Sequence, residues 1–202
     1  MIRLFATLLV ILTGGSVLAN SFPSTYQVAG VATDDTLNIR MSPDAGSVVI
    51  GEYASNRQHI EVLHTDPSGA WARVGLGEGM GWVSMTYLAR MPPPKTGAIP
   101  RPMHCGGTEP FWSLSMRLRG DEYATPDGGL KQLLMTHEQS GANGYLATFA
   151  EGPRSHRTLI VHRTLCNDGM SDRDFGFRAT LFNALDARNV VETGCCTLDS
   201  AN

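Results

Sequence analysis

A cluster of prolines near the middle of the chain limits what the chain can fold into. The segment 92–102 contains five prolines, which lack a backbone N–H donor and fix the φ angle. Such a segment cannot hold a helix or a central strand, and it is typical of a semi-rigid extended spacer. Its Pro spacing also fits a polyproline ligand, but its place between two periodic regions favours a linker over residues 91–103.

Short apolar alternations follow one another before this linker. Apolar and polar residues alternate over 37–41, as in a strand with one buried face. Four further apolar segments lie at 48–53, 60–64, 70–74 and 81–84, each bounded by Gly, Pro, Asp or Ser. Several short strands without a helix-length period favour a small β-barrel.

The motifs of this first region resemble the bacterial Src homology 3 domain. They run through residues 26–90 in the order and spacing of that family: Leu37-Asn38-Ile39-Arg40, Ser42-Pro43, Val49-Ile50-Gly51, Ile60-Glu61-Val62-Leu63, Trp71-Ala72-Arg73-Val74, Gly81-Trp82-Val83-Ser84 and Tyr87-Leu88. The resemblance implies a Src-homology-3-like barrel that binds cell-wall peptide or an envelope protein partner without catalysis.

Four side chains of this region are candidate ligand-binding residues. Trp71 and Tyr87 offer aromatic contact area, whereas Asn38 and Arg40 lie on the polar face of their strand. Arg40 can meet a peptide carboxylate with two parallel hydrogen bonds. In the alternative interpretation, Asn38 and Arg40 only hold the turn that follows them. Trp82 is expected in the core.

The region after the linker, residues 104–199, also has a β pattern. Apolar runs at 112–118, 145–150, 158–165, 175–182 and 190–198 are separated by Gly-, Asn- and Asp-rich turns. We expect a second antiparallel β barrel or sandwich, so that the whole chain is all-β. Residues 130–139 fit either a short helix or a strand.

Two segments of this second region resemble a family of exported bacterial proteins that has no assigned activity. The first is G-x-E-P-F-W at 107–112, and the second is C-x-D-G-M-S-D at 166–172. Related exported β-barrels include lysozyme inhibitors, so inhibition of a lysozyme is an alternative hypothesis. We expect Phe111 and Trp112 to enter the core, and the acidic run 167–174 to form a structural or recognition loop. That run lacks the spacing of a calcium-binding loop.

The four cysteines all lie in the second region, at Cys105, Cys166, Cys195 and Cys196. An even count favours two disulfides in an oxidising compartment. Neighbouring residues of a strand point to opposite faces, so Cys195 and Cys196 should each have a distant partner. Two connectivities remain: Cys105–Cys195 with Cys166–Cys196, or Cys105–Cys196 with Cys166–Cys195. A metal site formed by these cysteines with His104 and His162 is a weaker alternative, since it lacks C-x-x-C spacing.

Catalysis by a cysteine is the enzymatic alternative. Bacterial Src-homology-3-like domains often accompany cysteine peptidases of the cell wall, which suggests Cys105 as nucleophile with His162 or His156 as base. However, no helix N-terminus follows Cys105 to lower its pKa, and the D-C-S-G segment of those peptidases is absent. Glu109 has no evident second carboxylate for glycoside hydrolysis. We therefore expect no catalytic residue, no metal and no cofactor.

The N-terminus has the pattern of a secretory signal peptide over residues 1–19. Arg3 precedes a short apolar run, and small residues at Val17-Leu18-Ala19 favour cleavage after Ala19. No lipid-anchoring Cys follows, so we expect a periplasmic or secreted protein without a membrane anchor. Loss of Arg3, one of 16 basic residues, leaves 15 basic against 19 acidic residues and a net charge of −4. Such a chain is poorly suited to binding nucleic acid.

Overall fold

The computed structural model describes residues 22–95, 97–185 and 188–198. The expected signal peptide and its cleavage site after Ala19 lie outside these residues. Within them, all regular structure is β apart from one 3₁₀ turn, which confirms the all-β class. None of the helical structure found in these residues is long and apolar enough to cross a membrane.

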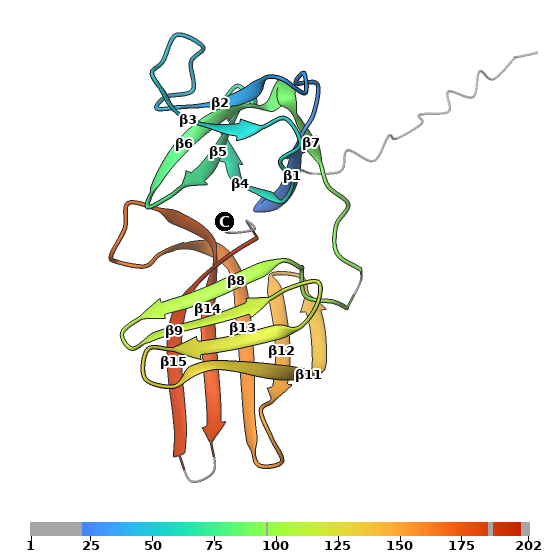
Figure 1. Cartoon of the computed structure of the whole chain (residues 1–202), viewed down its shortest axis with the longest axis vertical. Coiled ribbons are helices and arrows are strands. Elements are labelled where there is room, and N and C mark those ends of the chain that lie inside the picture. Colours follow the sequence, from blue (N-terminus) through green and yellow to red (C-terminus); the bar gives the residue numbers. More distant parts are fainter. Residues whose placement is uncertain (1–21, 96, 186–187, 199–202) are drawn as a thin grey trace, which may run out of the picture.

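The first part of the chain forms one curved antiparallel sheet, which we call the first sheet (Figure 1). Its elements are β1 (Ser24–Val28), β2 (Thr36–Arg40), β3 (Val49–Ala54), β4 (Ile60–Thr65), β5 (Trp71–Leu76), β6 (Gly79–Ser84), the 3₁₀ turn η1 (Met85–Tyr87) and β7 (Leu88–Arg90). The strand order is β3-β2-β6-β5-β4-β1-β7. Strands occur in all five segments expected from the sequence, and β1 and β7 extend the sheet.

Period-two alternation places the core of the first sheet on one face. On β2, Leu37 and Ile39 are buried in the core cluster, whereas Asn38 is exposed and Arg40 is half-buried on the other face. The polar face of β2 that the sequence predicts is therefore present, and it faces away from the core.

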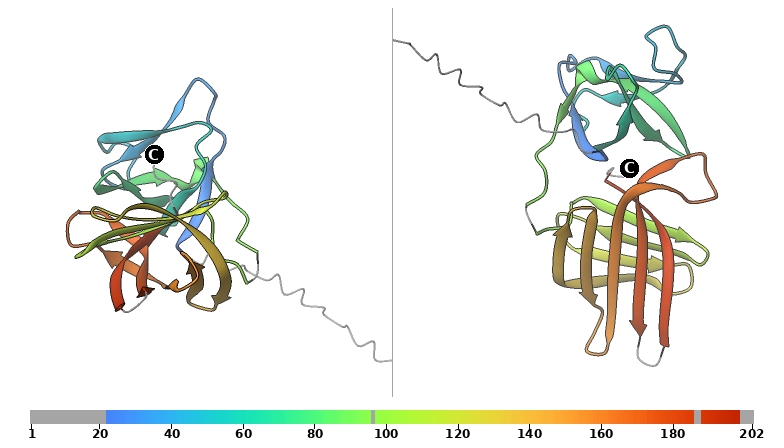
Figure 2. Two further views of the ribbon diagram at one scale, coloured as in Figure 1. Left: turned by 60° about the horizontal axis from the view of Figure 1, so that its bottom comes forward. Right: turned by 180° about the vertical axis from the view of Figure 1, so that it is seen from behind.

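The second part of the chain forms a closed eight-stranded barrel (Figure 2). Its strands are β8 (Met103–Thr108), β9 (Phe111–Met116), β10 (Asp121–Thr125), β11 (Gly129–Gly141), β12 (Gly144–Ala150), β13 (Ser155–Asn167), β14 (Asp174–Leu185) and β15 (Arg188–Thr197). The order is β10-β11-β12-β13-β14-β15-β8-β9, all antiparallel, so the expected barrel or sandwich is a barrel. Residues 130–139 lie in β11, which resolves the choice between helix and strand.

One expectation for the barrel core is wrong. Trp112 is buried, with 4% of its surface exposed, but Phe111 is 53% exposed. Both residues lie at the start of β9, and successive side chains of a strand point to opposite faces. Only one of the two neighbours can therefore enter the barrel.

The second half of the proline-rich segment is attached to the barrel. The Ile99 side chain is buried in the barrel core, and its backbone N–H donates to Glu138 Oε2 over 3.0 Å. The Gly97 N–H donates to Ser140 Oγ over 2.9 Å, and Arg101 pairs with Asp121. Residues 97–102 thus belong structurally to the barrel that follows them.

The barrel contacts the first sheet through β4. Glu61 of β4 is only 4% exposed and accepts hydrogen bonds from the Thr197 hydroxyl over 2.8 Å and the Leu198 N–H over 3.0 Å. Arg163 of β13 donates to the Pro23 carbonyl over 2.7 Å. Figure 1 shows the end of β15 running between the barrel and the first sheet. β4 is therefore buried on both faces, by its own core and by the barrel.

Replacement of Glu61 by alanine should lower the free energy of unfolding by about 2–4 kcal/mol, because two buried donors lose their acceptor. Urea unfolding of the mature protein measures this difference. The matched control is Glu78→Ala, since Glu78 is an exposed carboxylate between β5 and β6. It should change the free energy by no more than about 0.5 kcal/mol. Equal stabilities for the two variants would contradict the buried role of Glu61.

Candidate functional site

The four ligand-binding residues expected from the sequence line one groove on the first sheet. The groove has a volume of about 590 Å³, within the usual range for ligand pockets. Asn38, Arg40, Trp71 and Tyr87 all contribute to its lining. The other lining residues are Gly30, Val31, Ala32, Asp35, Thr36, Leu37, Ala45 and Ser84.

Antiparallel pairing brings these side chains together. Trp71 at the start of β5 pairs with Ser84 of β6, and Arg40 of β2 pairs with Trp82 of the same strand β6. Tyr87 follows in η1 and is 42% exposed. The groove therefore combines two aromatic side chains, from β5 and η1, with polar side chains from β2 and β6.

The position of Trp71 is fixed by the carboxylate of Asp66. Asp66 accepts a hydrogen bond from the Ser68 hydroxyl over 2.6 Å and another from the Trp71 N–H over 2.8 Å. These two bonds, the first above all, hold the pKa of Asp66 below its usual value. The tight turn between β4 and β5 thus sets where the indole ring enters the groove.

Arg40 has a structural contact of its own. Its Nη1 donates to the Ser47 carbonyl over 2.7 Å, which ties the β2–β3 loop to β2. This contact is the one expected if Arg40 holds the turn. Among the described residues, no carboxylate forms an ion pair with Arg40, although the Asp35 carboxylate also lines the groove.

The expectation that Trp82 lies in the core is wrong. Trp82 is half-buried on the outer face of β6, because its partners Arg40 and Arg73 also point outward. The Arg73 guanidinium lies 5.2 Å from the centre of the indole ring, and His64 contacts the ring edge-on at 5.6 Å.

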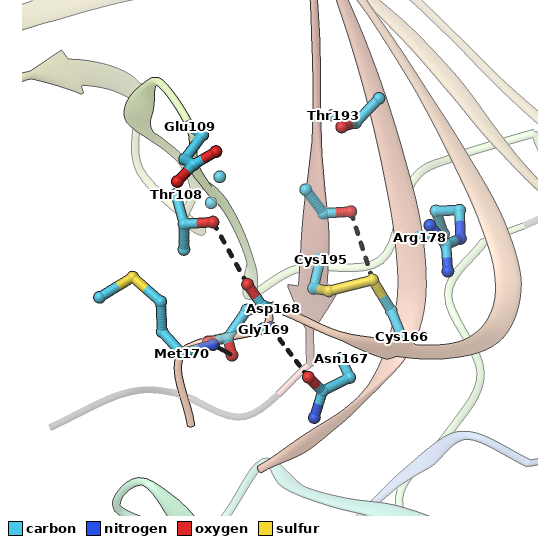
Figure 3. A pocket seen from close by; sticks show the side chains of 13 residues that line it. Thr108, Glu109, Cys166, Asn167, Asp168, Gly169, Met170, Arg178, Thr193 and Cys195 are labelled. Atoms are coloured by element: carbon cyan, nitrogen blue, oxygen red, sulfur yellow. Dashed lines mark hydrogen bonds between the residues drawn. A yellow bond between two sulfur atoms is a disulfide. The ribbon is translucent and has the colours of Figure 1, made fainter. Parts of the chain in front are cut away.

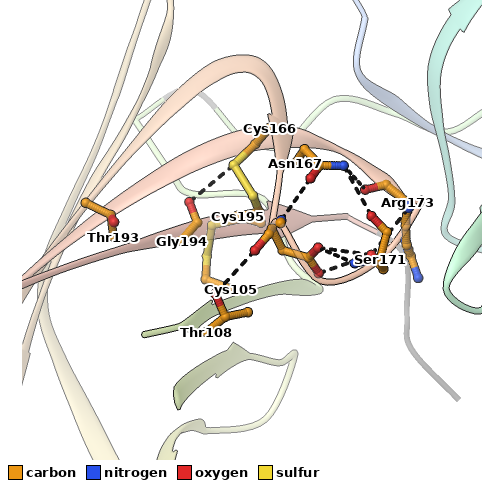
Figure 4. Close-up of a disulfide and its surroundings, with 12 residues drawn as sticks. Cys105, Thr108, Cys166, Asn167, Ser171, Arg173, Thr193, Gly194 and Cys195 are labelled. Carbon is orange, nitrogen blue, oxygen red and sulfur yellow. Dashed lines mark hydrogen bonds between the residues drawn. A yellow bond between two sulfur atoms is a disulfide. The ribbon is translucent and has the colours of Figure 1, made fainter. Parts of the chain in front are cut away.

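The four cysteines form two disulfides, Cys105–Cys196 and Cys166–Cys195 (Figure 4). Cys105 and Cys196 face each other across β8 and β15 inside the barrel core, and neither is exposed. Cys195 points to the other side of β15 and reaches the end of β13. The prediction that each neighbouring Cys has a distant partner is confirmed, and one of the two open connectivities is selected.

The two disulfides affect both alternative roles of the cysteines, namely that of a nucleophile and that of metal ligands. A buried cysteine in a disulfide has no thiolate, so Cys105 cannot act as a nucleophile in this form of the protein. A metal site formed by these cysteines would also need thiolates, and both disulfides together leave none of the four cysteines as a thiolate. Across residues 22–95, 97–185 and 188–198, no three His, Cys, Asp or Glu side chains are grouped so that they could hold a metal ion.

The acidic run after Cys166 forms a compact loop over residues 167–174, which we call the disulfide loop. Asp168 Oδ1 accepts from the N–H groups of Met170 over 3.0 Å and Ser171 over 2.9 Å, and from the Ser171 hydroxyl over 3.1 Å. Partial burial would raise the pKa of Asp168, but these hydrogen bonds together hold it below its usual value. The Gly169 N–H donates to Asn167 Oδ1 over 2.8 Å. Hydrogen bonds to its own side chains therefore hold the conformation of the loop.

A second cavity lies beside the disulfide loop (Figure 3). This loop cleft has a volume of about 470 Å³ and a largely polar lining. Its lining residues are Gly106, Gly107, Thr108, Glu109, Cys166, Asn167, Asp168, Gly169, Met170, Arg178, Thr193, Gly194 and Cys195. Sequence reasoning did not identify this cavity, although the two motifs of the second region supply most of its walls.

A buried charged cluster at the inner face of the barrel was also missed. Arg157 is 1% exposed, and its guanidinium pairs with Glu151, donates to Asn183 Oδ1 over 2.5 Å and lies 3.6 Å from the ring centre of Tyr123. Burial, and after it the nearby Glu192 carboxylate, raises the pKa of Tyr123 to about 12. The signal was present in the sequence, since Arg157 alternates in phase with inward-facing Leu159 and Val161.

Comparison with known proteins found no matching family model, no matching curated protein and no matching solved structure.

Proposed function

We propose that the protein is a non-catalytic binding protein for cell-wall peptide and that the groove of the first sheet is its ligand site. The observation that carries the proposal is the convergence of Asn38, Arg40, Trp71 and Tyr87 on one groove of about 590 Å³. Recognition without catalysis requires aromatic contact area and a few orienting polar groups, and the groove contains both.

The chemistry of the groove favours an extended ligand with a carboxylate. Arg40 is the cation among the lining residues, and its guanidinium can bind a carboxylate while Nη1 still holds the Ser47 carbonyl. Trp71 and Tyr87 would contact the apolar parts of a peptide. The lining residues include neither His nor Cys, the usual components of a nucleophile and base pair.

The proposed location, in the periplasm or outside the cell, agrees with the two disulfides of the barrel. Two disulfides are compatible with an oxidising compartment such as the periplasm or the cell exterior, where cell-wall peptides are accessible. The Src-homology-3-like character of the first sheet and the removal of residues 1–19 are parts of the same proposal.

Replacement of Tyr87 by alanine should weaken the binding of soluble wall peptides by about tenfold or more, the usual effect of removing an aromatic contact residue. Calorimetric titration with peptides released from purified cell wall measures this change. Because Tyr87 is 42% exposed, the melting temperature should stay close to that of the wild type. The matched control is Phe182→Ala, since Phe182 is 41% exposed and lies on the barrel.

Arg40→Lys separates the two roles of Arg40. Lysine keeps the positive charge and a donor for the Ser47 carbonyl, but it cannot make two parallel hydrogen bonds to a carboxylate. Weaker binding at an unchanged melting temperature supports carboxylate recognition. A lower melting temperature with unchanged affinity per folded molecule would instead mean that Arg40 only holds the β2–β3 loop. If the affinity were unchanged in Tyr87→Ala as well, the proposal would be overturned.

A further inference from the structure

The two motifs of the barrel meet at the loop cleft, although about 60 residues separate them in the sequence. Thr108 and Glu109 come from the G-x-E-P-F-W segment, and the disulfide loop contains the C-x-D-G-M-S-D segment. The Thr108 hydroxyl donates to the Asp168 carbonyl over 3.2 Å, which joins the two walls (Figure 3). The cleft is therefore formed mainly by residues of the two motifs.

The floor of the cleft is the outer surface of the barrel. Cys195 of β15 pairs with Gly106 of β8 on one side and with Arg178 of β14 on the other. Gly106 has no side chain, and a Cβ at this position would lie 3.3 Å from the Trp112 carbonyl oxygen. The Cys166–Cys195 disulfide holds the disulfide loop above this floor.

Most polar side chains of the cleft already have partners within the protein. Asn167 and Asp168 are engaged inside the disulfide loop, and Thr108 contacts the Asp168 carbonyl. The oxygens of Asp168 face N–H and O–H donors, and such donors would repel a bound cation. The cleft is therefore poorly suited to calcium, for which an acidic run of this kind is otherwise a candidate.

Three exposed polar side chains of the cleft have no partner among the described residues. They are the Glu109 carboxylate from the β8–β9 turn, the Arg178 guanidinium from β14 and the Thr193 hydroxyl from β15. Figure 3 shows Glu109 and Arg178 on different sides of the cleft, with the disulfide loop and its disulfide drawn between them. The cleft thus offers one negative group, one positive group and one hydroxyl to a ligand.

We propose that the loop cleft binds a zwitterionic ligand, namely a free amino acid or a short peptide whose two ends are both free. The ammonium group of the ligand lies against Glu109 and its carboxylate against Arg178, with Thr193 as a further hydrogen-bonding group. The Met170 side chain, 66% exposed at the rim, contacts the apolar part of the ligand. This site lies on the barrel and is distinct from the groove of the first sheet.

Titration of the mature protein with alanylalanine, followed by NMR or calorimetry, tests the proposal. The same titration is made with N-acetyl-alanylalanine, which lacks the cation, and with alanylalanine amide, which lacks the anion. The zwitterion should bind about tenfold or more tightly than either capped peptide, because each cap removes one charge-assisted hydrogen bond. Titration with alanine alone shows whether a free amino acid is sufficient.

Two charge-neutralising variants assign the charges to residues. Glu109→Gln should abolish the preference for a free amine, and Arg178→Gln should abolish the preference for a free carboxylate. Glu78→Gln and Arg119→Gln are matched controls at exposed positions outside the cleft and should retain both preferences. All these titrations are made in the Tyr87→Ala background, which weakens the groove of the first sheet, so that failure of the groove and failure of the cleft give different results.

Equal affinity for the zwitterion and both capped peptides would overturn the proposal. Charge preferences that persist in Glu109→Gln and Arg178→Gln would overturn it too, as would the absence of any binding at millimolar concentrations.

Discussion

Replacement of both Cys105 and Cys196 by alanine should lower the free energy of unfolding by about 4–5 kcal/mol, the largest effect expected of any change considered for this protein. The two residues are 91 positions apart, so their bond restricts a long stretch of the unfolded chain. It also joins β8 to β15, where the barrel closes. Changing both cysteines together avoids a free thiol that could form a new bond.

The second disulfide is the matched comparison. Cys166 and Cys195 are 29 positions apart, so replacing both by alanine should cost about 3–4 kcal/mol. Urea unfolding without a reductant, so that the remaining disulfides stay intact, measures the two losses. A larger loss for the Cys166–Cys195 pair, or no loss for either, would contradict the expected contribution of these bonds.

Replacement of Arg157 by methionine should lower the free energy of unfolding by about 3–5 kcal/mol. Arg157 is 1% exposed and connects Glu151 on one side with Asn183 on the other. Asn183 in turn donates to Glu192 over 2.6 Å. Methionine has a similar volume, so the loss would come from the missing charge rather than from an empty space. Asn183 loses its donor and the buried Glu192 beyond it loses a nearby cation, whereas Glu151 keeps its ion pair with Lys131.

A second variant tests the cause of this loss. Adding Glu192→Gln to Arg157→Met removes a carboxylate that the first change leaves uncompensated, and it should recover part of the lost stability. The exposed Arg119→Met is the control and should be nearly neutral. If Arg157→Met were as mild as this control, the buried cluster would not stabilise the barrel.

The sequence predicted those features of the fold that depend on local patterns. Alternation on β2 placed Leu37 and Ile39 inside and Asn38 and Arg40 outside, and this placement is present in the structure. The vicinal position of Cys195 and Cys196 excluded a bond between them for the same reason. The period-two alternation of a strand thus allowed us to predict which side chains share a face.

Features that depend on pairing between distant strands could not be predicted in this way. The choice between the two disulfide connectivities follows from the pairing of β15 with β8, which no local pattern specifies. Trp82 lies outside the core, contrary to expectation, because the pairing of β6 places it opposite two outward-facing arginines. Glu61 is buried because the barrel packs against β4, and the sequence of β4 alone does not predict this contact.

The candidate sites differ in the same respect. The four side chains of the groove could be predicted one by one from local features, although the pairing of β2 with β6 is what brings them together. The loop cleft could not, since it depends on the Cys166–Cys195 bond and on contact between Thr108 and the disulfide loop. Its residues were visible as two motifs, but only the fold brings the motifs together.

Titration of ¹⁵N-labelled protein with soluble wall peptides tests the proposed binding function most directly. The indole N–H signal of Trp71 should shift progressively with peptide concentration, because Trp71 lines the groove. The signal of Trp112 should not move, since this residue is 4% exposed inside the barrel. Shifts confined to signals of the barrel, or no shift of Trp71 at millimolar peptide, would contradict the proposal that the groove binds cell-wall peptide.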